Sequence, residues 1–156
     1  MYHITIQQAA DKALAPKTAL LKKFAKSALA RKTDSAEITI RMVTIEEMTT
    51  LNSTYRFKQG PTNVLSFPML LPDEVETEAA LLGDIVICSE VVNREAKEQH
   101  KEAVAHWAHM IVHGVFHLLG YDHQTDEDAL VMESLEIDVM KSLGFSDPYH
   151  VKDENE

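Results

Sequence analysis

Three histidines are spaced in a way that suits a metal ion. The stretch HGVFHLLGYDH contains His113, His117 and His123. Two histidines four residues apart on a helix project from one face, with Cβ atoms about 6 Å apart, so both imidazoles can reach one cation. Gly120 can adopt a left-handed conformation and let the chain leave the helix axis abruptly. His123 can then return to the same point.

This spacing predicts a zinc site. Three neutral imidazoles leave one tetrahedral position open for water, as in catalytic rather than structural zinc sites. We expect one zinc ion per chain, although the ligand types alone also suit nickel, copper or iron. The alternative is a set of helix histidines with no shared role. The pair at four-residue spacing alone would favour that alternative, but the third histidine after a helix-ending glycine favours the metal site.

The second position of the motif is occupied by Gly114. A zinc protease of the metzincin type has the same frame with glutamate at this position, where it acts as the general base. Glycine cannot accept a proton, so the sequence keeps the metal site without the protease base. A glutamate from elsewhere could replace it, and the acidic residues 73–78 offer candidates. A peptidase or amidase therefore remains an alternative.

Other residues near the motif have two interpretations. His106 and His109 lie near the same helical stripe as His113; interior or surface positions are favoured over a proton relay or contact with a metal ligand. Asp122 could orient a ligand imidazole through its carboxylate, or shape the turn. Cys88 ends an apolar strand and is expected in the core rather than as a thiolate ligand.

Four short segments have the patterns of β-strands. Alternation of apolar and polar residues predicts strands at residues 3–9 and 37–43. Two β-rich runs bounded by proline and glycine predict strands at residues 63–69 and 81–88. The residues between these two runs are acidic and predict a loop.

Helical patterns dominate the second half. A first helix follows Pro16, and the capping-box pattern of Thr44 and Glu47 opens a short helix that should end near Asn52. Residues 91–119 are helical with a break near His100. Thr125 begins the last helix, which Gly144 ends; its expected apolar positions are Leu130, Met132, Leu135, Val139 and Leu143. With strands early and long helices late, the fold class is α+β.

Charge is distributed unevenly along the chain. The net charge is −10, yet residues 1–60 hold ten Lys and Arg against five Asp and Glu. The basic residues centre on a run from Lys17 to Lys32, followed by Arg56 and Lys58. Such asymmetry suggests contact with a nucleic acid. For Lys22 to Lys32 alone, a solvated helix face is the favoured interpretation.

The remaining composition indicates a cytoplasmic protein. The chain has 156 residues, 45% of them hydrophobic, which predicts a single domain over residues 1–156 with a frayed tail from about residue 147. A single cysteine permits no internal disulfide. We expect no signal peptide and no membrane partner, because no segment approaches the roughly 20 apolar residues of a membrane span.

Three motifs in order resemble one known family. HGVFHLLGYDH, PTNVLSFP and LLGDIVIC together resemble the bacterial YbeY family of metal-dependent endoribonucleases, and NSTYRFKQGPTNVLSFP is similar to its arginine-bearing segment. The resemblance covers about residues 3–145. One visible departure is Phe116, where leucine or a similar residue is expected.

The resemblance implies a fold, a site and partners. The fold would be a small mixed four-stranded sheet packed with helices, with a metzincin-like zinc-binding helix. The zinc ligands would be His113, His117 and His123, and Arg56 would be a functional residue. The family acts in maturation of the 3′ end of 16S rRNA and in ribosome quality control, which implies single-stranded RNA, the ribosome or ribosome-assembly proteins as partners.

Three functions are therefore weighed. The first is a zinc-dependent, single-strand-specific endoribonuclease, in which Arg56 supplies a fixed cation for the phosphate. We expect Arg56 on a loop after the helix that ends near Asn52; the alternative is an ordinary surface arginine. The second function is the peptidase or amidase. The third is a noncatalytic ribosome-assembly factor in which zinc only fixes the histidine segment.

Overall fold

A four-stranded mixed sheet organises the structure. The computed structural model describes residues 1–69 and 80–149. The strand order is β1-β2-β4-β3; β1, β2 and β4 are parallel, and β3 is antiparallel to β4. The strands are β1 (Tyr2–Gln8), β2 (Ala36–Val43), β3 (Val64–Pro68) and β4 (Ala80–Cys88). The predicted α+β class and the four strands are confirmed.

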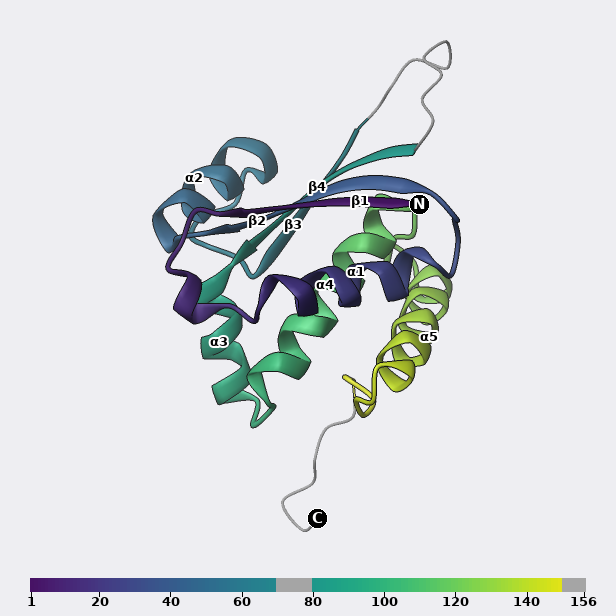
Figure 1. Ribbon diagram of the computed structural model, residues 1–156. Helices are drawn as coiled ribbons and strands as arrows, with labels where there is room; N and C mark the ends of the chain where they lie inside the picture. Colours follow the sequence, from purple (N-terminus) through teal and green to yellow (C-terminus); the bar gives the residue numbers. More distant parts are fainter. Residues whose placement is uncertain (70–79, 150–156) are drawn as a thin grey trace.

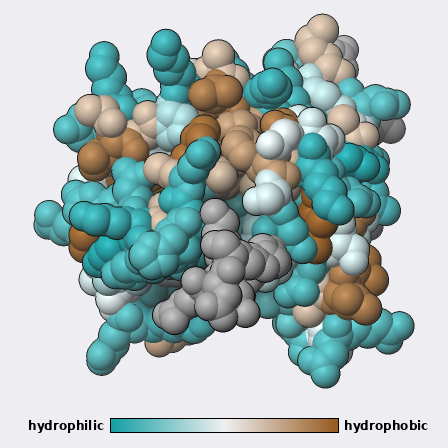
Figure 2. All heavy atoms as spheres, turned by 90° about the horizontal axis from the view of Figure 1, so that it is seen from below, coloured by the Kyte–Doolittle hydropathy of each residue, from teal (hydrophilic) through white to brown (hydrophobic). Residues whose placement is uncertain are grey.

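Helices cover both faces of this sheet unequally. In Figure 1, α2 lies on one side, and α1, α3, α4 and α5 lie on the other. A short 3-10 helix, η1 (Lys12–Leu14), precedes α1. The α-helices are α1 (Thr18–Leu29), α2 (Ile45–Arg56), α3 (Ser89–Glu98), α4 (Ala103–Leu118) and α5 (Asp126–Ser142). Seen from the helical side, hydrophilic residues cover much of the surface (Figure 2), as expected when helices turn their apolar sides inward.

The central element is α4. It contacts α1, α3 and α5 as well as β3 and β4. Its sequence is apolar around most of its circumference, which is typical of a helix buried on several sides. Trp107, Ile111, Val115 and Phe116 are all at most 1% exposed. The helix that carries the histidine motif is therefore held rigidly by the core.

Helix ends follow the sequence signals closely at three places. The side chain of Thr125 accepts a hydrogen bond from the Asp128 backbone N–H and caps α5. Thr44 likewise caps α2 at the Glu47 N–H, while the Glu47 carboxylate pairs with Arg41 instead of completing the capping box. The predicted break near His100 is confirmed between α3 and α4.

Two local predictions were wrong. Helix α2 continues past Asn52 to Arg56, and the Asn52 side chain donates to the Gly60 carbonyl, so it does not compete for its own helix backbone. Arg56 therefore lies in the last helical turn and not on a loop. Leu130, expected on the apolar side of α5, is 66% exposed.

The segment after α5 returns to the body of the protein. Residues 147–149 belong to the stretch that we expected to fray, but Pro148 is buried and its carbonyl accepts a hydrogen bond from Lys101 at 2.8 Å. The predicted fraying of residues 150–156 lies outside the described residues. Across the described parts of the chain, no helix has both the length and the apolar character needed to cross a membrane.

Candidate metal centre

The three histidines of the motif lie together at the carboxyl end of α4. The Nε2 atoms of His113 and His117 are 3.0 Å apart. The ring of His123 has its centre 5.7 Å from that of His113 and 5.1 Å from that of His117. Gly120 has a φ of 100°, the left-handed conformation that lets the chain turn back after the helix.

The spacing of His113 and His117 fits a divalent cation, and His123 lies beside both rings. Two ligands held tetrahedrally at 2.0–2.1 Å from zinc lie about 3.4 Å apart, close to the separation of the His113 and His117 nitrogens. Burial lowers the pKa of His117, and the neighbouring His113 and His123 lower it further. A neutral imidazole is the form that binds a metal.

Acidic groups extend this cluster on two sides. His117, Asp122 and His123 have potential ligand atoms within 4.8 Å of one another, and so do His109, His113 and Glu136. The Asp122 carboxylate accepts a hydrogen bond from the His123 backbone N–H at 2.7 Å, so Asp122 shapes the turn that carries His123.

Glu136 lies beneath the histidines and was missed by the sequence analysis. Its carboxylate, on α5, is fully buried. Oε1 accepts hydrogen bonds from His113 Nδ1 at 2.8 Å and from His109 Nε2 at 3.0 Å. A carboxylate on Nδ1 fixes the tautomer that leaves Nε2 free for a metal. The available signal was a glutamate in phase with the buried Met132, Val139 and Met140 of an amphipathic helix.

The hydrogen bonds keep Glu136 ionised. Burial alone would raise the pKa of this carboxyl, but hydrogen bonds from His109 and His113 and the charges of these histidines lower the pKa to about 2. Burial also lowers the pKa of His109, although Glu136 opposes that shift. The site therefore places the imidazoles of His109 and His117, whose pKa values are lowered, near a buried negative charge that a bound cation would balance.

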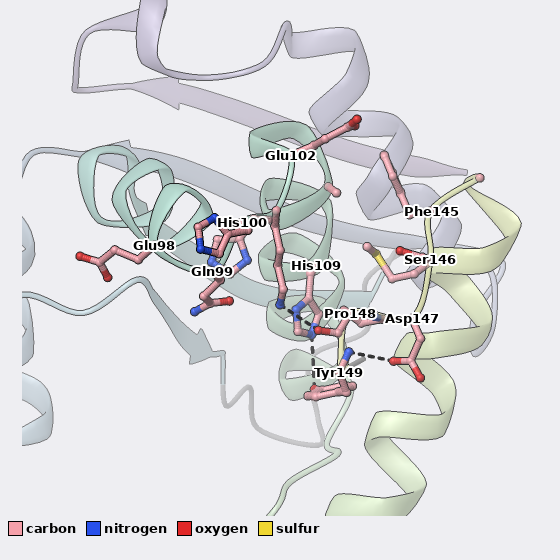
Figure 3. A pocket seen from close by; sticks show the side chains of 15 residues that line it. Glu98, Gln99, His100, Glu102, His109, Phe145, Ser146, Asp147, Pro148 and Tyr149 are labelled. Carbon is pink, nitrogen blue, oxygen red and sulfur yellow. Dashed lines mark hydrogen bonds between the residues drawn. The ribbon is translucent and has the colours of Figure 1, made fainter. Parts of the chain in front are cut away.

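Tyr149 completes the carboxylate's partners. Its hydroxyl donates to Glu136 Oε2 at 2.7 Å, and its ring lies edge-on to His109 with centroids 5.1 Å apart. Figure 3 shows the two rings side by side, at the end of the segment that contains Asp147 and Pro148. His109 and Tyr149 form a wall between two cavities. One, of about 660 Å³, lies toward the α3–α4 connection.

The other cavity contains the three histidines of the motif. Its volume is about 750 Å³, and His113, His117 and His123 share its lining with Arg56 and Lys58. Arg56 Nη2 donates to the Ser66 carbonyl at 2.9 Å, which fixes the guanidinium beside β3. Among the described residues, no α1 lysine lines this cavity. The structure thus brings Arg56 to the histidines across about 60 residues of sequence.

Gly114 faces the sheet. A Cβ at this position would lie 3.0 Å from Ile85 Cγ2, and the Gly114 carbonyl accepts a hydrogen bond from Ser66 Oγ. Glycine therefore allows α4 to pack closely on β4, and a larger residue would push against the side chain of Ile85. A glutamate side chain would have to displace the core before it could reach the cavity. The acidic residues 73–78, considered as substitutes for the protease base, lie outside the described residues.

Comparison with known proteins agrees with the resemblance. Residues 3–144 match the family model for endoribonuclease YbeY. The protein of that name from Alcanivorax borkumensis is 53% identical over 149 residues, a match that covers 94% of this chain and 85% of the relative. The protein of that name from Legionella pneumophila is 49% identical over 155 residues, a match that covers 99% of this chain and 98% of the relative. A Thermotoga maritima solution structure shares the fold, with a TM-score of 0.58, 22% identity, and coverage of 96% of this chain and 99% of that one.

Proposed function

The chain belongs to the YbeY endoribonuclease family, and from that premise we propose that it is a zinc-dependent enzyme that cleaves single-stranded RNA. His113, His117 and His123 bind the zinc ion, and Arg56 contacts the scissile phosphate. The observation that carries the proposal is one cavity lined by three converging imidazoles and a fixed guanidinium. The family membership itself identifies an RNA-cleaving hydrolase.

Glu136, Arg56 and Lys58 have different roles in this proposal. When bound, zinc supplies Lewis acidity, which polarises a phosphoryl oxygen and lowers the pKa of water. Glu136 holds His113 by its Nδ1 and keeps Nε2 directed at the ion. Among the described residues, the Arg56 side chain donates only from Nη2 to Ser66, so its other N–H donors can contact a phosphate with planar geometry. Lys58 adds positive charge on the same lining.

The substrate follows from the cavity and the family. A 750 Å³ cavity lined by histidines suits a flexible single strand, whose bases and phosphates can enter separately. We assign the 3′ end of 16S rRNA as the target, with the ribosome or its assembly proteins as partners in the cytoplasm. This assignment rests on the family resemblance. The close contact of Gly114 with Ile85 disfavours the peptidase, because it leaves no place for the protease glutamate.

Metal content and substrate choice test the proposal together. Protein purified without a histidine tag should contain about one zinc ion per chain, as expected for a single three-histidine site. His117→Ala should lose most of it. Metal-loaded protein should cleave single-stranded rRNA fragments and should not cleave denatured casein.

Three outcomes would contradict the proposal. Full metal retention by His117→Ala would exclude this metal site. Cleavage of casein alone would favour the peptidase. A folded, metal-loaded protein that cleaves neither would favour the noncatalytic assembly factor.

Arg56→Ala tests the phosphate contact. This variant should keep its fold and its zinc while single-turnover cleavage falls by about 100-fold or more, because a transition-state charge loses its fixed cation. Arg56→Lys should rescue poorly, since an ammonium lacks the planar fork. Lys22→Ala, on α1, is the matched control: it should weaken binding modestly and spare the chemistry. Parent-like cleavage by Arg56→Ala would make Arg56 an ordinary surface residue.

A further inference from the structure

Phe57 combines two features that are costly for a folded protein. Its side chain is 89% exposed, although it is large and apolar. Its φ is 57°, a left-handed conformation that is usually left to glycine or asparagine at the end of a helix. Only one other non-glycine residue of the described chain, His100, has such a φ. Packing against the described residues does not account for the exposure of this side chain.

The turn that presents Phe57 is fixed. The backbone N–H groups of Phe57 and Lys58 both donate to the carbonyl of Asn52 at the end of α2. The Asn52 side chain is buried and donates to the Gly60 carbonyl at 2.8 Å, which ties the following loop to the same helix. The phenyl ring therefore projects from a rigid support rather than from a loose loop.

The two neighbours of Phe57 in the chain line the cavity that contains the histidines. Arg56 and Lys58 belong to that lining and Phe57 itself does not, so its exposed side chain stands between two cations just outside the cavity. Tyr55 does not cover the phenyl ring, because its own ring packs edge-on against Phe67 at 5.4 Å. The sequence Tyr-Arg-Phe-Lys alternates aromatic and basic residues over one turn.

We propose that Phe57 is a stacking platform for one unpaired base of the RNA, next to the phosphate held by Arg56. An aromatic face stacks on any base, and adjacent cations neutralise the phosphates on either side of it. This pairing is typical of proteins that bind single strands. A duplex keeps its bases stacked inside, so the platform selects RNA with an accessible base. The inference rests on the proposed RNA substrate of the same cavity.

Three substitutions of Phe57 separate stacking from folding. Binding of a labelled single-stranded RNA of about ten nucleotides to the metal-loaded protein is measured by stopped-flow fluorescence anisotropy, before cleavage proceeds. Phe57→Ala should weaken binding roughly fivefold to tenfold, the low end for loss of one stacked base. Phe57→Gly should weaken binding equally while raising the unfolding temperature, because glycine adopts this φ without steric cost. Phe57→Trp should bind at least as tightly as the parent.

Two controls make the result specific. Leu130→Ala removes a comparably exposed apolar side chain from α5, outside the cavity, and should leave RNA binding unchanged. RNAs with a single abasic nucleotide at successive positions should include one that the parent and Phe57→Ala bind equally weakly, because the stacked base is missing.

The outcomes distinguish this inference from the proposed function. Parent-like binding by both Phe57→Ala and Phe57→Gly would overturn the platform, and RNA cleavage by the same proteins would leave the proposed function intact. Conversely, Phe57-dependent binding by a protein that cleaves no RNA would support the platform and overturn the nuclease. A parent protein that binds no single-stranded RNA would overturn both.

Discussion

His113 has contacts with most of the other residues of the candidate metal centre. Its Nε2 lies 3.0 Å from that of His117, and its Nδ1 is held by Glu136. Glu136 is held in turn by Tyr149, from the segment after α5. Residues far apart in sequence thus determine the orientation of one imidazole, and orienting groups of this kind typically affect metal affinity as strongly as activity.

Removing the Tyr149 hydroxyl should weaken zinc binding at the candidate metal centre. In Tyr149→Phe the buried Oε2 of Glu136 loses its donor, so the carboxylate holds His113 less firmly. We expect zinc affinity to fall by roughly tenfold, the low end for groups that orient metal ligands. Competition with a chelator of known affinity measures this change.

The matched control is Tyr121→Phe. Tyr121 lines the same cavity, and the cation of Lys32 lies 5.4 Å from the centre of its ring, an interaction that phenylalanine keeps. Its zinc affinity should equal that of the parent. The effect of Tyr149→Phe should also shrink in a Glu136→Gln background, because the hydroxyl acts through Glu136. Equal zinc affinity of the parent and Tyr149→Phe would remove Tyr149 from the metal centre.

At the scale of elements, the sequence predicted best where a pattern is local. The strands, the Thr125 cap and the break near His100 depend on neighbouring residues, so they were predictable. The extension of α2 to Arg56 is accompanied by a hydrogen bond from Asn52 to a loop eight residues later, a contact that no local pattern indicates. Glu136 was missed for a similar reason, since its role exists only after α4 and α5 pack together.

The packing of α4 on β4 predicts the result of restoring the protease motif. Gly114→Glu places a charged side chain at a position where a Cβ alone would lie 3.0 Å from the fully buried Ile85. Overpacking and burial of the carboxylate should together lower the free energy of unfolding by about 3 kcal/mol or more. Urea denaturation measures this loss. A variant of parental stability that gains casein cleavage would show that position 114 can supply a protease base.

The whole molecule places its charge in two regions with different roles. Arg56 and Lys58 bring positive charge from the basic first half to a cavity whose histidines come from the acidic second half. Beneath that cavity the protein buries the negative charge of Glu136. Stability should therefore depend on pH through this carboxyl group, in addition to any contribution from the metal ion.

Acid should destabilise the metal-free protein through Glu136. Its pKa is about 2 in the folded chain against an ordinary 4.5, so its contribution is fully present above about pH 4.5 and is lost as the pH falls toward 2. That difference corresponds to a contribution on the order of 3 kcal/mol at neutral pH. The pKa of His109 is also lowered, so protonation of His109 at acid pH likewise lowers the stability of the folded chain.

Glu136→Gln should reduce the loss of stability between pH 4.5 and 2, measured by urea denaturation in EDTA. Glu133→Gln on the same helix is the control and should keep the parental slope of stability against pH. Parallel curves for the parent and Glu136→Gln would show that the buried carboxylate does not control acid stability.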